Sequence, residues 1–237
     1  MCLILLAWQT HPDFPLLVAA NRDEFHERPT QPAHWWPDAP EIYAGRDLRA
    51  GGTWTGITRS GRFAALTNIR APAQQRSDAH SRGQIVTAAL QAPQIEAFLL
   101  EIEQTASRYN GFNLLVGDRE ALWHFNSEQA RAERVAPGIH GLSNANLDTP
   151  WPKLTRGSAG LADAVKRRAG PEALFTVLSD EQLAPDDALP DTGVPLEWER
   201  WLSAIRINAP GYGTRSQSVV LLPREGEPRL IERVLIP

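Results

Sequence analysis

The only cysteine of the chain is its second residue, Cys2, and an apolar segment follows it directly. We expect Met1 to be removed, because the residue after it is small. The new terminus would carry an α-amine with a reference pKa of about 7.7–8.0 and a thiol with one of about 8.5. One residue would then supply a nucleophile and a proton acceptor near neutral pH. The alternative is that Cys2 is a small buried side chain without chemistry, as free cysteines usually are.

A polar tetrad, Asn21-Arg22-Asp23-Glu24, ends the second apolar segment of the chain. If the first two apolar segments pair as a hairpin, the tetrad lies beside Cys2. There, Arg22 would lower the pKa of the thiol and Asp23 would hold the α-amine. The other interpretation of the tetrad is a solvated turn.

Two asparagines and one arginine stand at the ends of other strand-like segments. Asn68 ends Phe63–Thr67, and Asn144 ends Gly141–Ser143. An amide held at such a point can donate to a developing oxyanion, while an ordinary turn asparagine is the alternative. Arg215 precedes a late strand, where it would bind a carboxylate or support a thiolate. Its alternative is a surface arginine.

Residues 26–50 are rich in proline and tryptophan, and we predict a long ordered loop there. Trp35 and Trp36 in this segment are candidates for an apolar wall facing a ligand. The residues expected to contact a ligand are Asn21, Glu24, Trp35, Trp36 and Trp54. The six histidines are scattered without His-x-x-x-His spacing, so no metal site is predicted.

The bulk composition argues against several classes of function. The 237 residues carry a net charge of −4, so neither nucleic acid nor an anionic membrane is expected as an electrostatic partner. Lys153 and Lys166 are the only lysines, which leaves few candidates for a Schiff base or a Ser–Lys pair. No glycine-rich loop ends in Lys-Ser/Thr, which disfavours P-loop nucleotide hydrolysis. The expected partner is a small-molecule ligand or substrate, and the sequence predicts no particular oligomeric state.

The single cysteine and the N-terminal pattern bear on location. One cysteine cannot form an internal disulfide, which fits a reducing compartment. The apolar Leu3–Trp8 is too short to span a bilayer and no basic residue precedes it. A lipoprotein cysteine would follow the apolar run, whereas Cys2 precedes it. We therefore expect a cytoplasmic protein without membrane insertion.

Strand-like and helix-like segments occur in blocks along one domain, residues 1–237. Strands are expected at 3–8, 16–20, 53–58, 62–68, 112–116, 121–125, 140–143, 218–222 and 230–236. Helices are expected at 81–90, 94–109, 152–168, 171–178 and 196–205. Strands in clusters separated by helices predict an α+β fold, with antiparallel sheets packed face to face and helices outside, rather than alternating βαβ units.

The opening Met1-Cys2, the apolar strand and the Asn21-Arg22-Asp23-Glu24 tetrad resemble the NRDE-motif family, which is the family of transport and Golgi organisation proteins. Further matching stretches keep the same order over nearly the whole chain: Gly51-Gly52-Thr53-Trp54, Ala65-Leu66-Thr67-Asn68, Ser81-Arg82-Gly83, Gly111-Phe112-Asn113-Leu114-Leu115, Leu142-Ser143-Asn144 and Gly213-Thr214-Arg215-Ser216. The resemblance supports a functional Cys2.

The family is in turn distantly similar to the cysteine N-terminal-nucleophile hydrolases, such as bile-salt hydrolase and penicillin V acylase. That likeness implies a four-layer αββα sandwich with two antiparallel sheets. Cys2 matches the nucleophile, Asn144 an oxyanion-hole asparagine, Asn68 a second functional asparagine and Arg215 a late arginine. One feature departs from the pattern: those hydrolases place an arginine and an aspartate three residues apart, whereas Arg22 and Asp23 are adjacent and point to opposite faces of a strand.

Two functions of different classes are implied. In the first, the chain is an amidohydrolase for a small non-peptide amide that needs no cofactor: Cys2 attacks the carbonyl and its α-amine relays the proton. Asn144 and Asn68 stabilise the oxyanion, and Arg22 or Asp23 tunes the nucleophile. In the second, the chain is a non-catalytic binding or trafficking protein for haem or an acyl-CoA or lipid ligand, to which family members have been linked. The fold alone does not choose between them.

Overall fold

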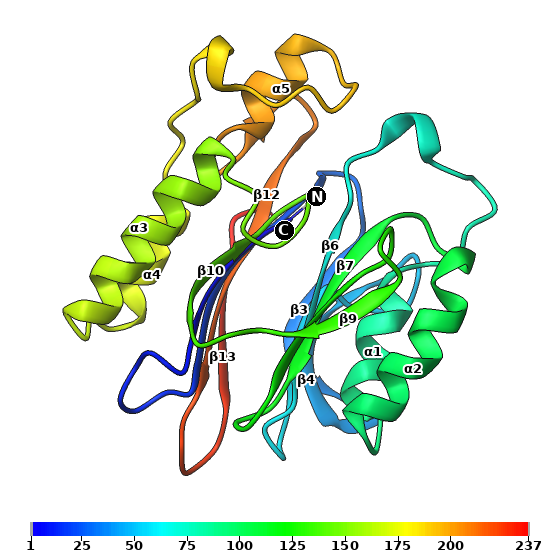
Figure 1. The fold of residues 1–237 in the computed structure, drawn as a ribbon, viewed down its shortest axis with the longest axis vertical. Coiled ribbons are helices and arrows are strands. Elements are labelled where there is room, and N and C mark those ends of the chain that lie inside the picture. Colours follow the sequence, from blue (N-terminus) through cyan, green and yellow to red (C-terminus); the bar gives the residue numbers. More distant parts are fainter. Residues whose placement is uncertain (1, 237) are drawn as a thin grey trace.

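The computed structural model describes residues 2–236, in which two antiparallel sheets pack face to face between outer helices (Figure 1). The predicted α+β fold, a four-layer αββα sandwich, is thereby confirmed. The expected loss of Met1 concerns a residue outside the described range and stays a prediction.

The first sheet is built around the N-terminal hairpin of β1 (Cys2–Trp8) and β2 (Leu16–Phe25). Its strand order is β10-β1-β2-β12-β11, and β13 also pairs with β12. The other bounds are β10 (Gly138–Leu142), β11 (Asn208–Ala209), β12 (Tyr212–Leu222) and β13 (Arg229–Val234). Both strands of the N-terminal hairpin are therefore internal, with partners from the second half of the chain.

The second sheet is a meander in the order β3-β4-β5-β6-β7-β8-β9. Its strands are β3 (Thr30–Trp36), β4 (Ala39–Asp47), β5 (Thr55–Thr58), β6 (Phe63–Asn68), β7 (Phe112–Gly117), β8 (Leu122–Asn126) and β9 (Arg131–Arg134). Each strand pairs with its neighbours in sequence, so short turns connect most of the sheet.

The predicted loop at residues 26–50 is wrong, because β3 and β4 occupy most of it. β3 is an edge strand, where the missing N–H of Pro32 is tolerated. Irregularities in the pairing with β4 after Gln31 and after Trp35 also interrupt the two-residue alternation that would have marked a strand.

Helices cover the outer face of each sheet (Figure 1). On the second sheet lie α1 (Gly83–Gln91) and α2 (Ile95–Thr105), and on the first lie α3 (Pro152–Lys166) and α4 (Pro171–Leu178). A short helix, α5 (Leu196–Leu202), lies at the end of the first sheet near the start of β1 (Figure 1). Short 3-10 turns occur at Pro72–Gln74, Ala106–Arg108 and Asp186–Ala188.

Alternation along β1 divides the core. Ile4 and Leu6 join the apolar cluster between the two sheets, whereas Leu3 and Leu5 join the cluster under α3 and α4. All four side chains are at most 2% exposed. The same alternation puts the side chain of Cys2 on the face between the sheets.

No helix within residues 2–236 combines the length and apolar character that crossing a membrane requires.

His124 on β8 makes folding stability sensitive to acid. Burial lowers its pKa to about 4, against about 6.5 for an unfolded histidine. As pH falls from about 6.5 to about 4, the unfolded chain binds a proton first, so the free energy of unfolding should decrease by about 3 kcal/mol. Urea unfolding over this range measures the loss. His124→Gln should flatten the profile relative to His34→Gln on the edge strand, and equal profiles for the two variants would contradict the assignment.

Candidate active site

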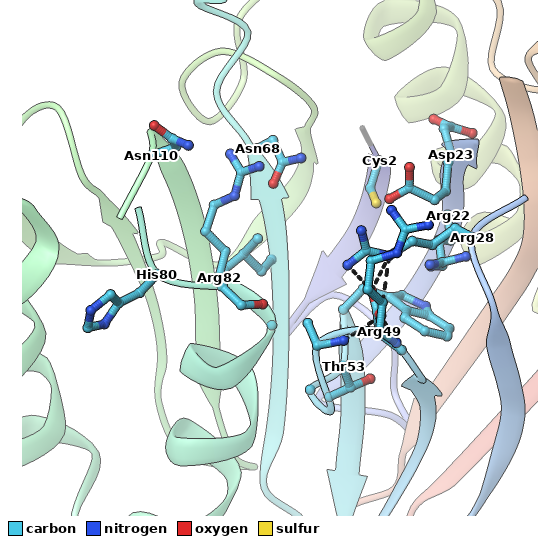
Figure 2. A pocket seen from close by; sticks show the side chains of 18 of the residues that line it. Cys2, Arg22, Asp23, Arg28, Arg49, Thr53, Asn68, His80, Arg82 and Asn110 are labelled. Atoms are coloured by element: carbon cyan, nitrogen blue, oxygen red, sulfur yellow. Dashed lines mark hydrogen bonds and ion pairs between the residues drawn. The ribbon is translucent and has the colours of Figure 1, made fainter. Parts of the chain in front are cut away.

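The register between β1 and β2 places Cys2 directly opposite Arg22. Directly opposed residues of an antiparallel pair point to the same face, so both side chains face the space between the sheets. Figure 2 shows them side by side, with Cys2 at the start of β1 and Arg22 near the end of β2. Of the two charged residues in the tetrad, Arg22 therefore accompanies the Cys2 thiol.

The thiol lies in a mixed electrostatic environment. Burial is the largest influence and raises the pKa of Cys2, and the charge of Asp23 adds to the rise. A hydrogen bond from the backbone of Asp23 and the positive charge of Arg22 act in the opposite direction. Among the described residues, the tetrad on β2 thus contributes two of the influences that favour the thiolate.

The guanidinium of Arg22 is held by stacking. Its Cζ lies 4.2 Å from the centroid of the Trp54 ring, within the range of a cation–π contact. Trp54 precedes β5 on the opposite sheet, so this contact joins the two sheets at the mouth of the site. An aromatic face leaves the N–H donors of the arginine available toward the pocket.

Asp23 points to the other side of the first sheet, toward the helices. Thr214 on β12 donates its hydroxyl to Asp23 Oδ1 at 2.6 Å. Burial raises the pKa of Asp23, and Lys153 is the strongest influence that opposes the rise. Asn21, on the same face, donates its amide to the carbonyls of Leu178 at 2.9 Å and Ile205 at 2.8 Å. Asn21 thereby ties β2 to the helical layer.

A cavity of about 410 Å³ opens at the Cys2 end of the sheets (Figure 2). The residues assigned from the sequence that line it are Cys2, Arg22, Asp23, Glu24, Trp54 and Asn68. Further basic groups on its wall are Arg28, Arg49, His80 and Arg82. These four were not predicted from the sequence, although Arg82 belongs to the matching stretch Ser81-Arg82-Gly83. Arg28 is paired with Asp47 at 2.9 Å, so its charge is already balanced.

Asn144 does not line this cavity; it lines a neighbouring one together with Arg70 and Trp151. The preceding Ser143 donates its hydroxyl to the Cys2 carbonyl at 3.2 Å. The Asn144 amide donates to the main-chain carbonyl of Asn68 at 2.8 Å. The two asparagines therefore contact each other beside the start of β1, although they are far apart in sequence.

Arg70 fixes the orientation of the Asn144 amide. Arg70 Nη2 donates to Asn144 Oδ1 at 3.4 Å, so the amide nitrogen must point the other way. Arg70 Nη1 is bonded to Glu199 on α5 at 2.8 Å, and both side chains are less than 5% exposed. This pair was not predicted from the sequence, because nothing in the spacing of Arg70 and Glu199 indicates that α5 reaches the end of β6.

Arg215 does not line the cavity, but it binds main-chain groups of a segment that does. It lies where the pairing of β12 with β2 shifts register, between Thr214 and Ser216. Its guanidinium donates to the main-chain carbonyls of Phe25 and Arg28. These contacts hold the segment after β2 that carries Arg28 to the wall of the cavity.

Trp35 and Trp36 also lie off the cavity. Trp35 packs edge-on against Tyr43, and Arg59 stacks on it at 3.7 Å. Trp36 is 2% exposed in the core under α1 and α2, and its indole N–H donates to the carbonyl of Ala44. Within the described chain, no three His, Cys, Asp or Glu side chains cluster closely enough to hold a metal ion.

Two solved structures share this architecture. A Caenorhabditis elegans N-acylethanolamine-hydrolyzing acid amidase ortholog matches with a TM-score of 0.50 and 9% identity, over 99% of this chain and all of that one. The C2A mutant of the conjugated bile acid hydrolase from Clostridium perfringens matches with a TM-score of 0.52 and 7% identity, over 99% of this chain and 92% of that one. The fold is thus that of the N-terminal-nucleophile hydrolases.

The sequence relatives give the family. The family model described as Transport and Golgi organisation 2 matches residues 1–237. The Bos taurus Transport and Golgi organization protein 2 homolog is 35% identical over all of this chain and 94% of its own length. The Drosophila melanogaster Transport and Golgi organization protein 2 is 29% identical over 99% of this chain and 92% of its own length. The chain belongs to the Transport and Golgi organisation 2 family.

Removing the cation beside the thiol should slow alkylation of Cys2. In Arg22→Gln we expect the pKa of the thiol to rise and the iodoacetamide rate at pH 7 to fall by about three- to tenfold, because fewer molecules carry a thiolate. Intact-mass kinetics measure the rate. Arg59→Gln removes an arginine stacked on another tryptophan, and it should react like the unmodified protein. An unchanged rate in Arg22→Gln would show that Arg22 does not act on the sulfur.

Neutralising Glu199 should destabilise the fold strongly. Glu199→Gln leaves Arg70 buried without its counter-charge, which costs about 3–5 kcal/mol. The free energy of unfolding in urea gives the value, with the exposed neighbour Glu197→Gln as control. A loss no greater than that of the control would mean that the pair contributes no net stability.

Proposed function

We propose that this protein is a cysteine N-terminal-nucleophile hydrolase that cleaves a small non-peptide amide. The observation that carries the proposal is the position of Cys2: it is the first residue of an internal strand, and it opens into a cavity next to an arginine. A nucleophile at a chain terminus needs no separate general base if its own α-amine is free. The N-terminal-nucleophile fold of the two structural neighbours supports this class.

The first half-reaction forms a thioester on Cys2. The sulfur attacks the amide carbonyl, and the thiol proton passes to the α-amine. As the tetrahedral intermediate collapses, the carbon–nitrogen bond breaks and the leaving amine takes that proton. In the second half-reaction the α-amine accepts a proton from water, the hydroxide attacks the thioester, and the acid is released with the thiol restored.

The oxyanion requires fixed donors in the first and second steps. The Asn144 amide nitrogen carries two hydrogens, and one is donated to the Asn68 carbonyl. The contact of Arg70 with Asn144 Oδ1 fixes the orientation of the amide, and thereby the direction of its second hydrogen. We assign Asn144 and Asn68 to oxyanion binding, Arg22 to support of the thiolate, and Asp23 to orientation of the α-amine. Arg215 would act indirectly, through the segment that carries Arg28.

Intact-mass measurement tests the proposal in two stages. The purified protein should lack Met1, and a panel of N-acyl amides should yield an acyl adduct on Cys2 that disappears with turnover. Cys2→Ser and Cys2→Ala should lose at least about 10³-fold in rate, as expected for removal of a nucleophile. Hydrolysis that persists in Cys2→Ala would refute the mechanism, as would a retained Met1, because the base would then be blocked.

A binding function on the same fold is the second candidate, and the basic lining of the cavity favours it. Arg49, Arg82 and His80 face a space next to Cys2, and arginine pairs well with the carboxylates of haem or the phosphates of acyl-CoA. Cys2 would then be a ligand contact in a cytoplasmic carrier. Titration with haem and with acyl-CoA distinguishes the two: saturable binding lost in Arg82→Gln, with no acyl adduct, would favour the carrier.

A further inference from the structure

Lys153 is a buried cation in an unusual place. It lies in the first turn of α3, directly after Pro152, and it is 1% exposed. A helix N-terminus carries a partial positive charge, which disfavours a cation there. Its Nζ has no hydrogen-bond partner among the described residues. Such an arrangement costs free energy and calls for an explanation, since lysine is almost never fully buried without a partner.

The charged groups around Lys153 come from every element packed at this end of the first sheet. Asp23 on β2, Cys2 on β1 and Glu199 on α5 attract it, and Arg70 after β6 repels it. Tyr212 on β12 also faces Asp23, and burial raises the pKa of Tyr212 well above its usual value. Glu199 is already paired with Arg70 at 2.8 Å. Among these groups, the negative charge of Asp23 is the strongest influence that favours the protonated form of Lys153.

The α-amine of a processed Cys2 would face the same carboxylate. β1 runs antiparallel to β2, and Cys2 is opposite Arg22. The main-chain nitrogen of Cys2 is therefore directed along the strand toward the level of the next β2 residue, Asp23. Two cations would then share one carboxylate in a buried site, and this is unfavourable by several kcal/mol. A neutral form of one of the two amines would avoid this cost.

We propose that Lys153 is a positioning residue that keeps the α-amine of processed Cys2 unprotonated, by supplying the cation that Asp23 requires. The neutral α-amine is the form that can accept the thiol proton. Lys153 acts through Asp23 and touches no substrate. This inference rests on the proposed function, because it assumes that Cys2 carries a free α-amine.

The electrostatics agree with this division of charge. Burial and Arg70 lower the pKa of Lys153 to about 8, so the lysine remains mostly protonated at neutral pH. A protonated neighbour lowers the pKa of an α-amine below its reference of about 7.7–8.0. The exposed Lys166 at the other end of α3 has no such surroundings.

Isotope labelling tests the inference without any substrate. The chain has one cysteine and two lysines, so ¹³C-cysteine reports only Cys2 and ¹³C-lysine reports only Lys153 and Lys166. NMR titration of the Cys2 Cα follows the α-amine. In Lys153→Met we expect the pKa of the α-amine to rise by about 1–2 pH units, because a neighbouring like charge is lost. In Lys153→Arg, whose charge is permanent, it should stay at or below the value of the unmodified protein.

Lys166→Met is the matched control and should leave the α-amine unchanged. A folded Lys153→Met whose α-amine titrates as in the unmodified protein would overturn the inference. A Lys153→Arg that behaves like Lys153→Met would also do so, because shape rather than charge would then be responsible. If instead the mass shows that Met1 is retained, the proposed function fails as well, so the two failures are distinguishable.

Discussion

The pairing of β1 with β2 is the constraint on which the rest of the site depends. Its register puts Cys2 opposite Arg22 and sends Asp23 to the helical side. A slip by one residue would turn every side chain of β1 to the other face, so the thiol would enter the layer under α3 and α4. The slip is prevented by burial on both faces, because Ile4 and Leu6 fill the space between the sheets while Leu3 and Leu5 fill the helical side. The apolar residues of β1 thus determine where its one reactive group points.

Burial on both faces has an electrostatic consequence at the end of the strands. Arg22 and the thiol lie between the sheets, while Asp23, Lys153, Arg70 and Glu199 lie on the helical side. The first sheet therefore separates two groups of charged side chains. The main chain of Cys2 lies in this sheet, between the two groups. Such charges are costly to bury. On the helical side they are covered by α5 and the first turn of α3.

The sequence was sufficient for the architecture and for part of the site. The apolar runs and their turn residues predicted the N-terminal hairpin and the two sheets, because strands buried on both faces read as continuous apolar runs. The loop predicted for residues 26–50 was wrong, because an edge strand that contains Pro32 and pairs irregularly leaves no such pattern. Cys2, Arg22, Asp23, Glu24 and Asn68 were expected to lie together and they line one cavity, because strand ends at one edge of a sheet meet, whereas Asn21 contacts the helical layer. Arg70, Glu199 and Lys153 were missed as members of the site, because their positions depend on how α3 and α5 pack, and no local signal records that.

The strand order also governs the timing of assembly during synthesis. β1 and β2 emerge from the ribosome first, yet their outer partners are β10 and β12, and β12 lies near the end of the chain. The first sheet cannot close until nearly all of the polypeptide has been made, and such long-range pairing is slow. If Met1 is removed, as we expect, an aminopeptidase can act throughout that interval, before the sheet closes. The topology would then place processing before closure of the first sheet.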